Sequence, residues 1–141
     1  MIDMEELEID AELKNLEKVL AFVDSRLEQS DCPMSVQISI DVAVEELFVN
    51  IAHYAYSMSP EGKGKAWIRI GFGENPTTVT LTFADKGIPF DPLKKPDPDV
   101  TLKAEDRKIG GLGIYMVKKS MDSVAYERRD DMNILTITKK F

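Results

Sequence analysis

The sequence places a carboxylate and a carboxamide four residues apart inside an apolar stretch. Glu46 and Asn50 stand in the run EELFVN at 45–50. In a helix, residues four apart lie on the same face, so these two side chains would be neighbours. A carboxylate that can accept a proton, one turn from an amide oxygen that can ligate a hard cation, suits metal-assisted phosphoryl transfer. Taken alone, such a pair is more often part of a solvated helix face.

A second segment could recognise a flat heterocyclic ring. The run DKGIPFDP at 85–92 follows a predicted strand, and functional residues on such a loop are held rigidly. Asp85 offers acceptor oxygens to an exocyclic amino group, and Gly87 allows the backbone to approach a ring closely. Asp, Gly and Pro are equally the residues of an ordinary turn, so this segment by itself leaves both interpretations open.

A third segment has the composition of an anion site. Gly110, Gly111 and Gly113 stand at the start of a predicted helix, where free backbone amides and the positive helix end attract phosphate. The pattern matches neither the dinucleotide-binding nor the Walker fingerprint. Arg107 and Lys108, just before it, favour the phosphate interpretation, because an acidic protein needs local positive charge to bind a polyanion.

The composition limits the classes of protein that these motifs can serve. A chain of 141 residues that is 43% hydrophobic can bury one core, so a single domain over 1–141 is expected. The 18 basic and 25 acidic residues give a formal net charge of -7, which argues against direct nucleic-acid binding. The lone Cys32 and an acidic amino terminus without a long apolar run predict no disulfide, no membrane span and a cytoplasmic protein.

Apolar periodicity predicts the elements that must position the three segments. The helix that carries Glu46 and Asn50 is expected over 35–56, and a polar, proline-containing loop is expected at 92–108. The other elements expected are a strand at 4–9, a helix at 12–29, a hairpin at 67–72 and 77–83, a helix at 110–121 and a hairpin at 123–129 and 134–140.

Together the three segments resemble the ATP-binding boxes of the histidine-kinase-like ATPases. The boxes correspond to Glu46-x-x-x-Asn50, the run at 85–92 and the run GGLG at 110–113. The small size, the Phe90-Asp91-Pro92 extension and the tail at 121–128 are similar to the anti-sigma-factor serine kinases, the RsbW-like group. This resemblance covers essentially the whole chain. It implies an α+β fold, a two-layer α/β sandwich of the Bergerat type, whose mixed, mostly antiparallel sheet carries helices on one face.

The resemblance also implies a role for each matching residue. Glu46 corresponds to the general base, or to the carboxylate that orients the attacking hydroxyl, and Asn50 corresponds to the Mg²⁺ ligand. Asp85 corresponds to the acceptor for the adenine amino group of ATP. Gly87 and Ile88 belong to the same expected cofactor-binding set, beside the ring.

The phosphate side of the resemblance rests on the glycine run. Gly110, Gly111 and Gly113 correspond to the backbone cradle for the phosphates, and 94–109 corresponds to a lid over ATP. In that lid, Lys108 is preferred to its neighbour Arg107 as the phosphate contact.

Two departures from the family pattern limit what can be carried over. Many relatives have a threonine at the start of the last strand, which supports a water near adenine, whereas this chain has Asn133. His53 is displaced by one position from the histidine of many relatives, so no role is assigned to it.

The activity implied by the resemblance is transfer of the γ-phosphoryl group of ATP to a serine or threonine on a small antagonist protein. A sigma factor would be the protein that is sequestered. The alternative is a nucleotide-binding switch module that sequesters a protein without kinase activity. Glu46 favours the kinase, because binding alone does not need a base. The sequence identifies neither partner, and it leaves the oligomeric state open, with a homodimer as one option.

Overall fold

Five strands form one sheet at the centre of the molecule. The computed structural model describes residues 4–74, 77–94 and 112–141. The strands are β1 (Met4–Asp10), β2 (Lys65–Gly73), β3 (Thr78–Asp85), β4 (Ser123–Arg129) and β5 (Met132–Lys140). Their order across the sheet is β1-β2-β3-β5-β4, and each of these described pairings is antiparallel. The strand that ends in Asp85 is therefore the middle strand of the sheet.

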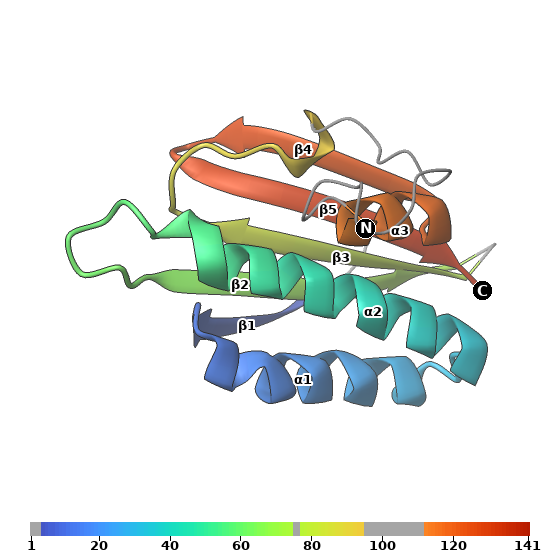
Figure 1. The fold of residues 1–141 in the computed structure, drawn as a ribbon. Coiled ribbons are helices and arrows are strands. Elements are labelled where there is room, and N and C mark those ends of the chain that lie inside the picture. The colour runs from blue at the N-terminus through green and yellow to red at the C-terminus, as the bar shows by residue number, and fades with distance from the viewer. Residues whose placement is uncertain (1–3, 75–76, 95–111) are drawn as a thin grey trace.

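The longer helices lie together on one face of this sheet (Figure 1). They are α1 (Leu16–Gln29), α2 (Met34–Asn50) and α3 (Leu112–Ser120). A π-helical turn, Ile51–Ala55, extends α2, and short 3-10 turns occupy Leu13–Asn15 and Pro92–Lys94. The start of α2 is fixed by Pro33, whose carbonyl accepts the first backbone hydrogen bonds of the helix from Val36 and Gln37.

The core lies between the helices and the inner face of the sheet. Side chains of period two on the strands point inward, and side chains of period three to four on the helices meet them. The inward residues are almost completely buried: Ala66, Ile68 and Ile70 on β2, Val79, Leu81 and Phe83 on β3, Leu135 and Ile137 on β5, Val19, Val23 and Leu27 on α1, and Ile40, Val44 and Phe48 on α2. This apolar layer holds the end of α2 against the end of β3.

The expected two-layer α+β architecture is confirmed, with helices on one face and described strand pairings that are antiparallel throughout. The predicted strands and helices are present, and the helix expected over 35–56 ends in the π-helical turn. The predicted lid lies almost entirely at 95–109, outside the described residues. Within the described part of the chain, no helix is both long and apolar enough to cross a bilayer.

Two carboxyl groups face each other between α1 and α2. Asp24 Oδ1 and Asp41 Oδ1 are buried without a hydrogen-bond partner in the described part of the chain. Burial, the facing Asp24 and the nearby Glu28 raise the pKa of Asp41 to about 8. Because an unfolded carboxyl ionises near its usual pKa, folding favours the protonated form of this group.

The protein should therefore lose stability as the pH rises from about 4 to about 8, and Asp41→Asn should reduce that loss. The amide is uncharged and has nearly the same shape as the protonated acid. After a discount for the solvent that reaches Asp41, we expect the variant to be more stable by on the order of 1 kcal/mol at about pH 8.5. Urea unfolding at about pH 5 and about pH 8.5 measures this difference.

Asp131→Asn is the matched control, because Asp131 is exposed and its positive φ of 62° suits asparagine. It should keep the pH dependence of the unmodified protein. An Asp41→Asn curve parallel to that of the unmodified protein would show that Asp41 does not take up a proton on folding.

Candidate functional site

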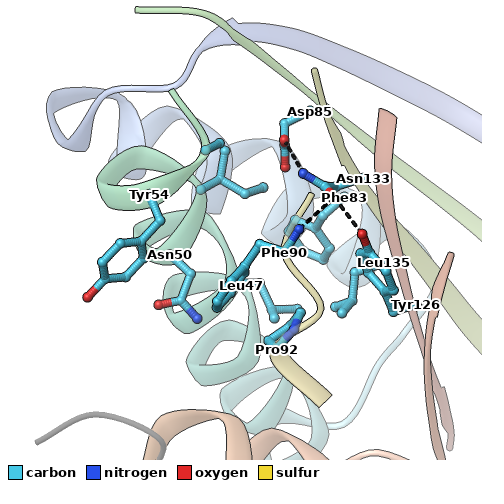
Figure 2. Close-up of a pocket in the computed structure, with 12 residues that line it drawn as sticks. Leu47, Asn50, Tyr54, Phe83, Asp85, Phe90, Pro92, Tyr126, Asn133 and Leu135 are labelled. Atoms are coloured by element: carbon cyan, nitrogen blue, oxygen red, sulfur yellow. Dashed lines mark hydrogen bonds between the residues drawn. The ribbon is translucent and has the colours of Figure 1, made fainter. Parts of the chain in front are cut away.

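A cavity opens where the end of α2 meets the ends of β3, β4 and β5. Its wall comes from α2 and the π-helical turn, from the strands, and from the segment that follows β3 (Figure 2). Three polar side chains, those of Asn50, Asp85 and Asn133, reach it from different elements. The rest of the lining is apolar or aromatic and includes Leu47, Phe83, Leu135, Tyr54, Phe90 and Tyr126. An apolar cavity with a few convergent polar groups is the usual form of a small-molecule site.

Asp85 is the buried charge of this cavity. Its residue surface is only 5% exposed. Its Oδ1 accepts hydrogen bonds from the Gly87 backbone N–H and from Asn133 Nδ2, both at 2.9 Å. Asp85 Oδ2 accepts no hydrogen bond from the residues that the structure describes. One oxygen is thus occupied by the protein, and the other remains for a donor on a ligand.

The ionisation of Asp85 reflects opposing influences. The pKa of its carboxyl group is raised, because burial outweighs the hydrogen bonds from Asn133 and Gly87 and the charge of Arg128, which act in the lowering direction. Hydrogen bonds to a carboxylate favour its charged, acceptor-only form. The neighbours of Asp85 therefore favour the form that receives a donor.

Close packing joins the loop after β3 to the π-helical turn. Ala55 O accepts a hydrogen bond of 2.9 Å from the Ile88 backbone N–H. A Cβ atom at Gly87 would lie 2.0 Å from the same carbonyl oxygen. Only glycine fits this approach without movement of the backbone. A π-helical turn within a helix often marks a functional position, and here it directs the Ala55 carbonyl toward the loop.

Tyr56, the residue after Ala55, holds the start of the same loop. Its hydroxyl accepts a hydrogen bond of 2.9 Å from the Lys86 backbone N–H and donates one to the Lys65 carbonyl. Gly64 gives the ring its space, because a Cβ there would lie 2.2 Å from ring atoms of Tyr56. The start of the loop after β3 is therefore tied to the start of β2.

Glu46 and Asn50 are in contact, as their spacing predicts. Asn50 Nδ2 donates to Glu46 Oε1 at 3.3 Å. This bond engages the amide nitrogen, so that the amide oxygen of Asn50 is left for another partner. A Cβ at Gly113 would lie 2.1 Å from the Glu46 carboxyl carbon, so the start of α3 lies directly against this carboxylate. Three residues from two motifs thus meet at one point.

The structure brings together several of the residues predicted from sequence. Asn50 and Asp85 line the cavity, and Glu46 is one helical turn from Asn50. Gly87 and Ile88 belong to the adjacent loop, and both make backbone contacts to Ala55. Lys108, Gly110 and Gly111 lie outside the described residues. His53 is exposed and is not among the described residues that line the cavity.

Sequence reasoning placed Asn133 near the expected adenine site but missed its contacts, and it missed Tyr126 and Arg128 on the same β4–β5 hairpin. Tyr126 and Asn133 line the cavity, and Arg128 Nη1 donates to the Gly87 carbonyl at 2.9 Å. The available signal was the strand alternation, because Tyr126 and Arg128 share one face of β4. The register pairs Asn133 directly with Asp85, and no sequence pattern shows that pairing.

Gly87→Ala should detach the loop from the π-helical turn. Because the Cβ would meet a backbone oxygen, we expect a loss of about 1–3 kcal/mol in the free energy of unfolding. We also expect faster hydrogen exchange at the Ile88 amide, which in the unmodified protein donates to the Ala55 carbonyl. Gly62→Ala is the control. Its positive φ of 64° adds strain without any contact within 4 Å, so Ile88 exchange should not change. Slow exchange at Ile88 in Gly87→Ala would contradict this account.

Comparison with known proteins identifies a matching family and a related kinase. The family model described as "Histidine kinase-like ATPase domain" matches residues 9–139. The serine/threonine-protein kinase BtrW of Bordetella bronchiseptica is 26% identical over 103 residues, which are 73% of this chain and 70% of that protein.

A solved structure supports the fold independently. The RsbU and RsbW domains of a Mycobacterium tuberculosis protein match 96% of this chain with a TM-score of 0.59 at 15% identity. This chain spans only 32% of that solved chain, and at this identity the likeness concerns the fold alone. The matched stretch 9–139 spans the positions of Glu46, Asn50, Asp85 and Gly113. The chain belongs to the family of histidine kinase-like ATPase domains.

Proposed function

We propose that this protein is an ATP-dependent serine/threonine protein kinase and anti-sigma regulatory factor, built as one nucleotide-binding domain. The observation that carries the proposal is the meeting of Glu46, Asn50 and Gly113 beside the cavity that Asp85 lines. Family membership implies nucleotide binding. A positioned carboxylate next to that site supports group transfer in addition to binding.

The chemistry of the cavity lining supports adenine as the bound base. Its walls are apolar and aromatic, which suits a flat heterocycle, and Asp85 Oδ2 is left for the exocyclic amino group. A guanine would present a carbonyl oxygen at that point, and two acceptors would face each other. The site therefore favours ATP over GTP.

Asn50 fits the role of a magnesium ligand. The described part of the chain holds no group of three or more His, Cys, Asp or Glu side chains that could bind a metal ion by themselves. Mg²⁺ at kinase sites is held largely by substrate phosphates and waters with few protein ligands, so a single amide oxygen suffices here. Bound Mg²⁺ would supply charge neutralisation for the transferred phosphoryl group. The Asn50–Glu46 bond turns the amide oxygen away from the carboxylate and keeps it free.

Glu46 would act on the acceptor hydroxyl. As the hydroxyl oxygen of a serine or threonine forms its bond to the γ-phosphorus, the bond from that phosphorus to the β,γ-bridging oxygen breaks. The hydroxyl proton passes to the Glu46 carboxylate, and ADP leaves with the bridging oxygen. The contact of Asn50 with Oε1 fixes the orientation of the carboxylate, which is the positioning that such a base needs.

The relatives support a proposal for the partners. One relative is named as a serine/threonine-protein kinase, and a structural neighbour contains an RsbW domain next to an RsbU domain. We therefore propose a small antagonist protein as phosphoacceptor and a sigma factor as the sequestered protein, in the cytoplasm. The alternative is a switch module that binds nucleotide and partner without phosphoryl transfer.

Asp85→Asn should greatly reduce the affinity for Mg-ATP and Mg-ADP. The asparagine oxygen would keep the bonds from Gly87 and Asn133, so the new amide nitrogen would face the adenine amino group. Two donors opposite each other cost on the order of 1–3 kcal/mol, a loss of about 5- to 150-fold. Isothermal titration calorimetry measures it. Equal affinity in both proteins would show that Asp85 does not bind the adenine amino group.

Glu46→Gln separates the kinase from the switch module. Nucleotide affinity should be nearly intact, because the contacts to adenine come from another segment. The rate of phosphoryl transfer should fall by about 10²- to 10⁴-fold. The assay follows labelled phosphate from ATP to the cognate antagonist, identified by co-purification.

Glu45→Gln is the matched control for this variant, since Glu45 is the exposed neighbour on the same helix. It should transfer phosphate at the unmodified rate. If the unmodified protein binds its antagonist and transfers no phosphate, the switch module replaces the kinase. If Glu46→Gln keeps the full rate, the kinase stands and Glu46 is not its base.

A further inference from the structure

Asn133 is the most highly connected polar side chain of the cavity. It lies on β5 directly opposite Asp85 and is 6% exposed. Its Nδ2 donates to Asp85 Oδ1 at 2.9 Å and to the Ile88 carbonyl at 2.7 Å. Its Oδ1 accepts from the Tyr126 hydroxyl at 2.6 Å and from the Phe90 backbone N–H at 3.2 Å. Figure 2 shows three of these bonds converging on the one amide.

These four bonds use the whole hydrogen-bonding capacity that the Asn133 amide normally shows: two donors and two acceptor positions. They also fix its orientation. A rotated amide would direct its oxygen at the oxygens of Asp85 and Ile88, and its nitrogen at the Phe90 N–H donor. Asn133 therefore has no donor or acceptor left for a ligand or for a water beside one.

The partners of Asn133 all belong to one stretch of chain, from Asp85 to Phe90, apart from Tyr126. Arg128 holds the same stretch, because its Nη1 donates to the Gly87 carbonyl. The β4–β5 hairpin thus contacts the loop through two side chains, Asn133 and Arg128, and Tyr126 supports the first of them. Ala55 and Tyr56 fix the same loop from the helix side.

We propose that Asn133, supported by Tyr126 and Arg128, is the positioning residue that sets the base selectivity of this site by holding Asp85 with one oxygen occupied and the other aimed at the exocyclic amino group. This inference rests on the proposed function, in which Asp85 receives adenine. In this proposal Asn133 acts through Asp85, because the protein engages all of its own donors and acceptors.

The test compares ADP with inosine diphosphate, which carries a carbonyl oxygen in place of the amino group. The unmodified protein should bind ADP more tightly, because Asp85 Oδ2 repels the inosine carbonyl. In Asn133→Ala the carboxylate loses one fixed partner and can turn. We expect the affinity for ADP to fall about tenfold, with little change for inosine diphosphate, so the selectivity ratio should fall about tenfold.

Asn15→Ala is the matched control. Asn15 is also a buried asparagine, 7% exposed, and its Nδ2 donates to the Asp10 carbonyl near the start of α1, away from the cavity. It should lower the unfolding temperature and leave the ADP to inosine diphosphate ratio unchanged. Tyr126→Phe, which removes only one hydroxyl, tests the same network if Asn133→Ala does not fold. In Tyr126→Phe the ratio of the affinities for ADP and inosine diphosphate should fall about threefold.

The outcomes separate this inference from the proposed function. If the unmodified protein binds both diphosphates equally, Asp85 does not receive the adenine amino group, and the inference falls together with that assignment. If the unmodified protein prefers ADP and both network variants keep the same preference, the proposed function stands and the positioning role of Asn133 is overturned. Equal losses for the two ligands in Asn133→Ala would show a merely structural role.

Discussion

The buried carboxylate of Asp85 is the constraint on which the rest of the site depends. A charge in an apolar cavity is costly unless hydrogen bonds and opposite charge compensate for lost water. Here the compensation comes from the Gly87 N–H, the Asn133 amide and the charge of Arg128. Each partner must therefore be held in place, which explains why the loop after β3 is fixed on both sides although it is a loop.

This arrangement also couples the two halves of the site. The loop contacts Ala55 in the π-helical turn, and that turn continues from the helix that carries Glu46 and Asn50. Loop, turn and helix form one continuous set of backbone contacts. The loop proposed to bind adenine therefore has a fixed position relative to the helix proposed to act at the phosphates. Such a fixed arrangement is what positioning in phosphoryl transfer requires.

The sequence predicted a large part of this correctly, for physical reasons that are local. The spacing of Glu46 and Asn50 is a property of any helix, and their contact follows from it. The need for glycine at 87 follows from a close backbone approach, although the partner is the Ala55 carbonyl and the ring approach remains a prediction. The strands and helices followed from apolar periodicity, whose period differs between the two types of element.

What the sequence alone determined, then, is the order of the elements, the residue types at each motif and the contacts within one helical turn. Only the tertiary structure decided that Asn133 pairs with Asp85, that Arg128 reaches the Gly87 carbonyl and that Gly113 lies against Glu46. Asp85 and Asn133 are separated by 48 positions in the chain. Strand register and helix packing bring them together, and both are fixed by the whole apolar core and not by any short segment.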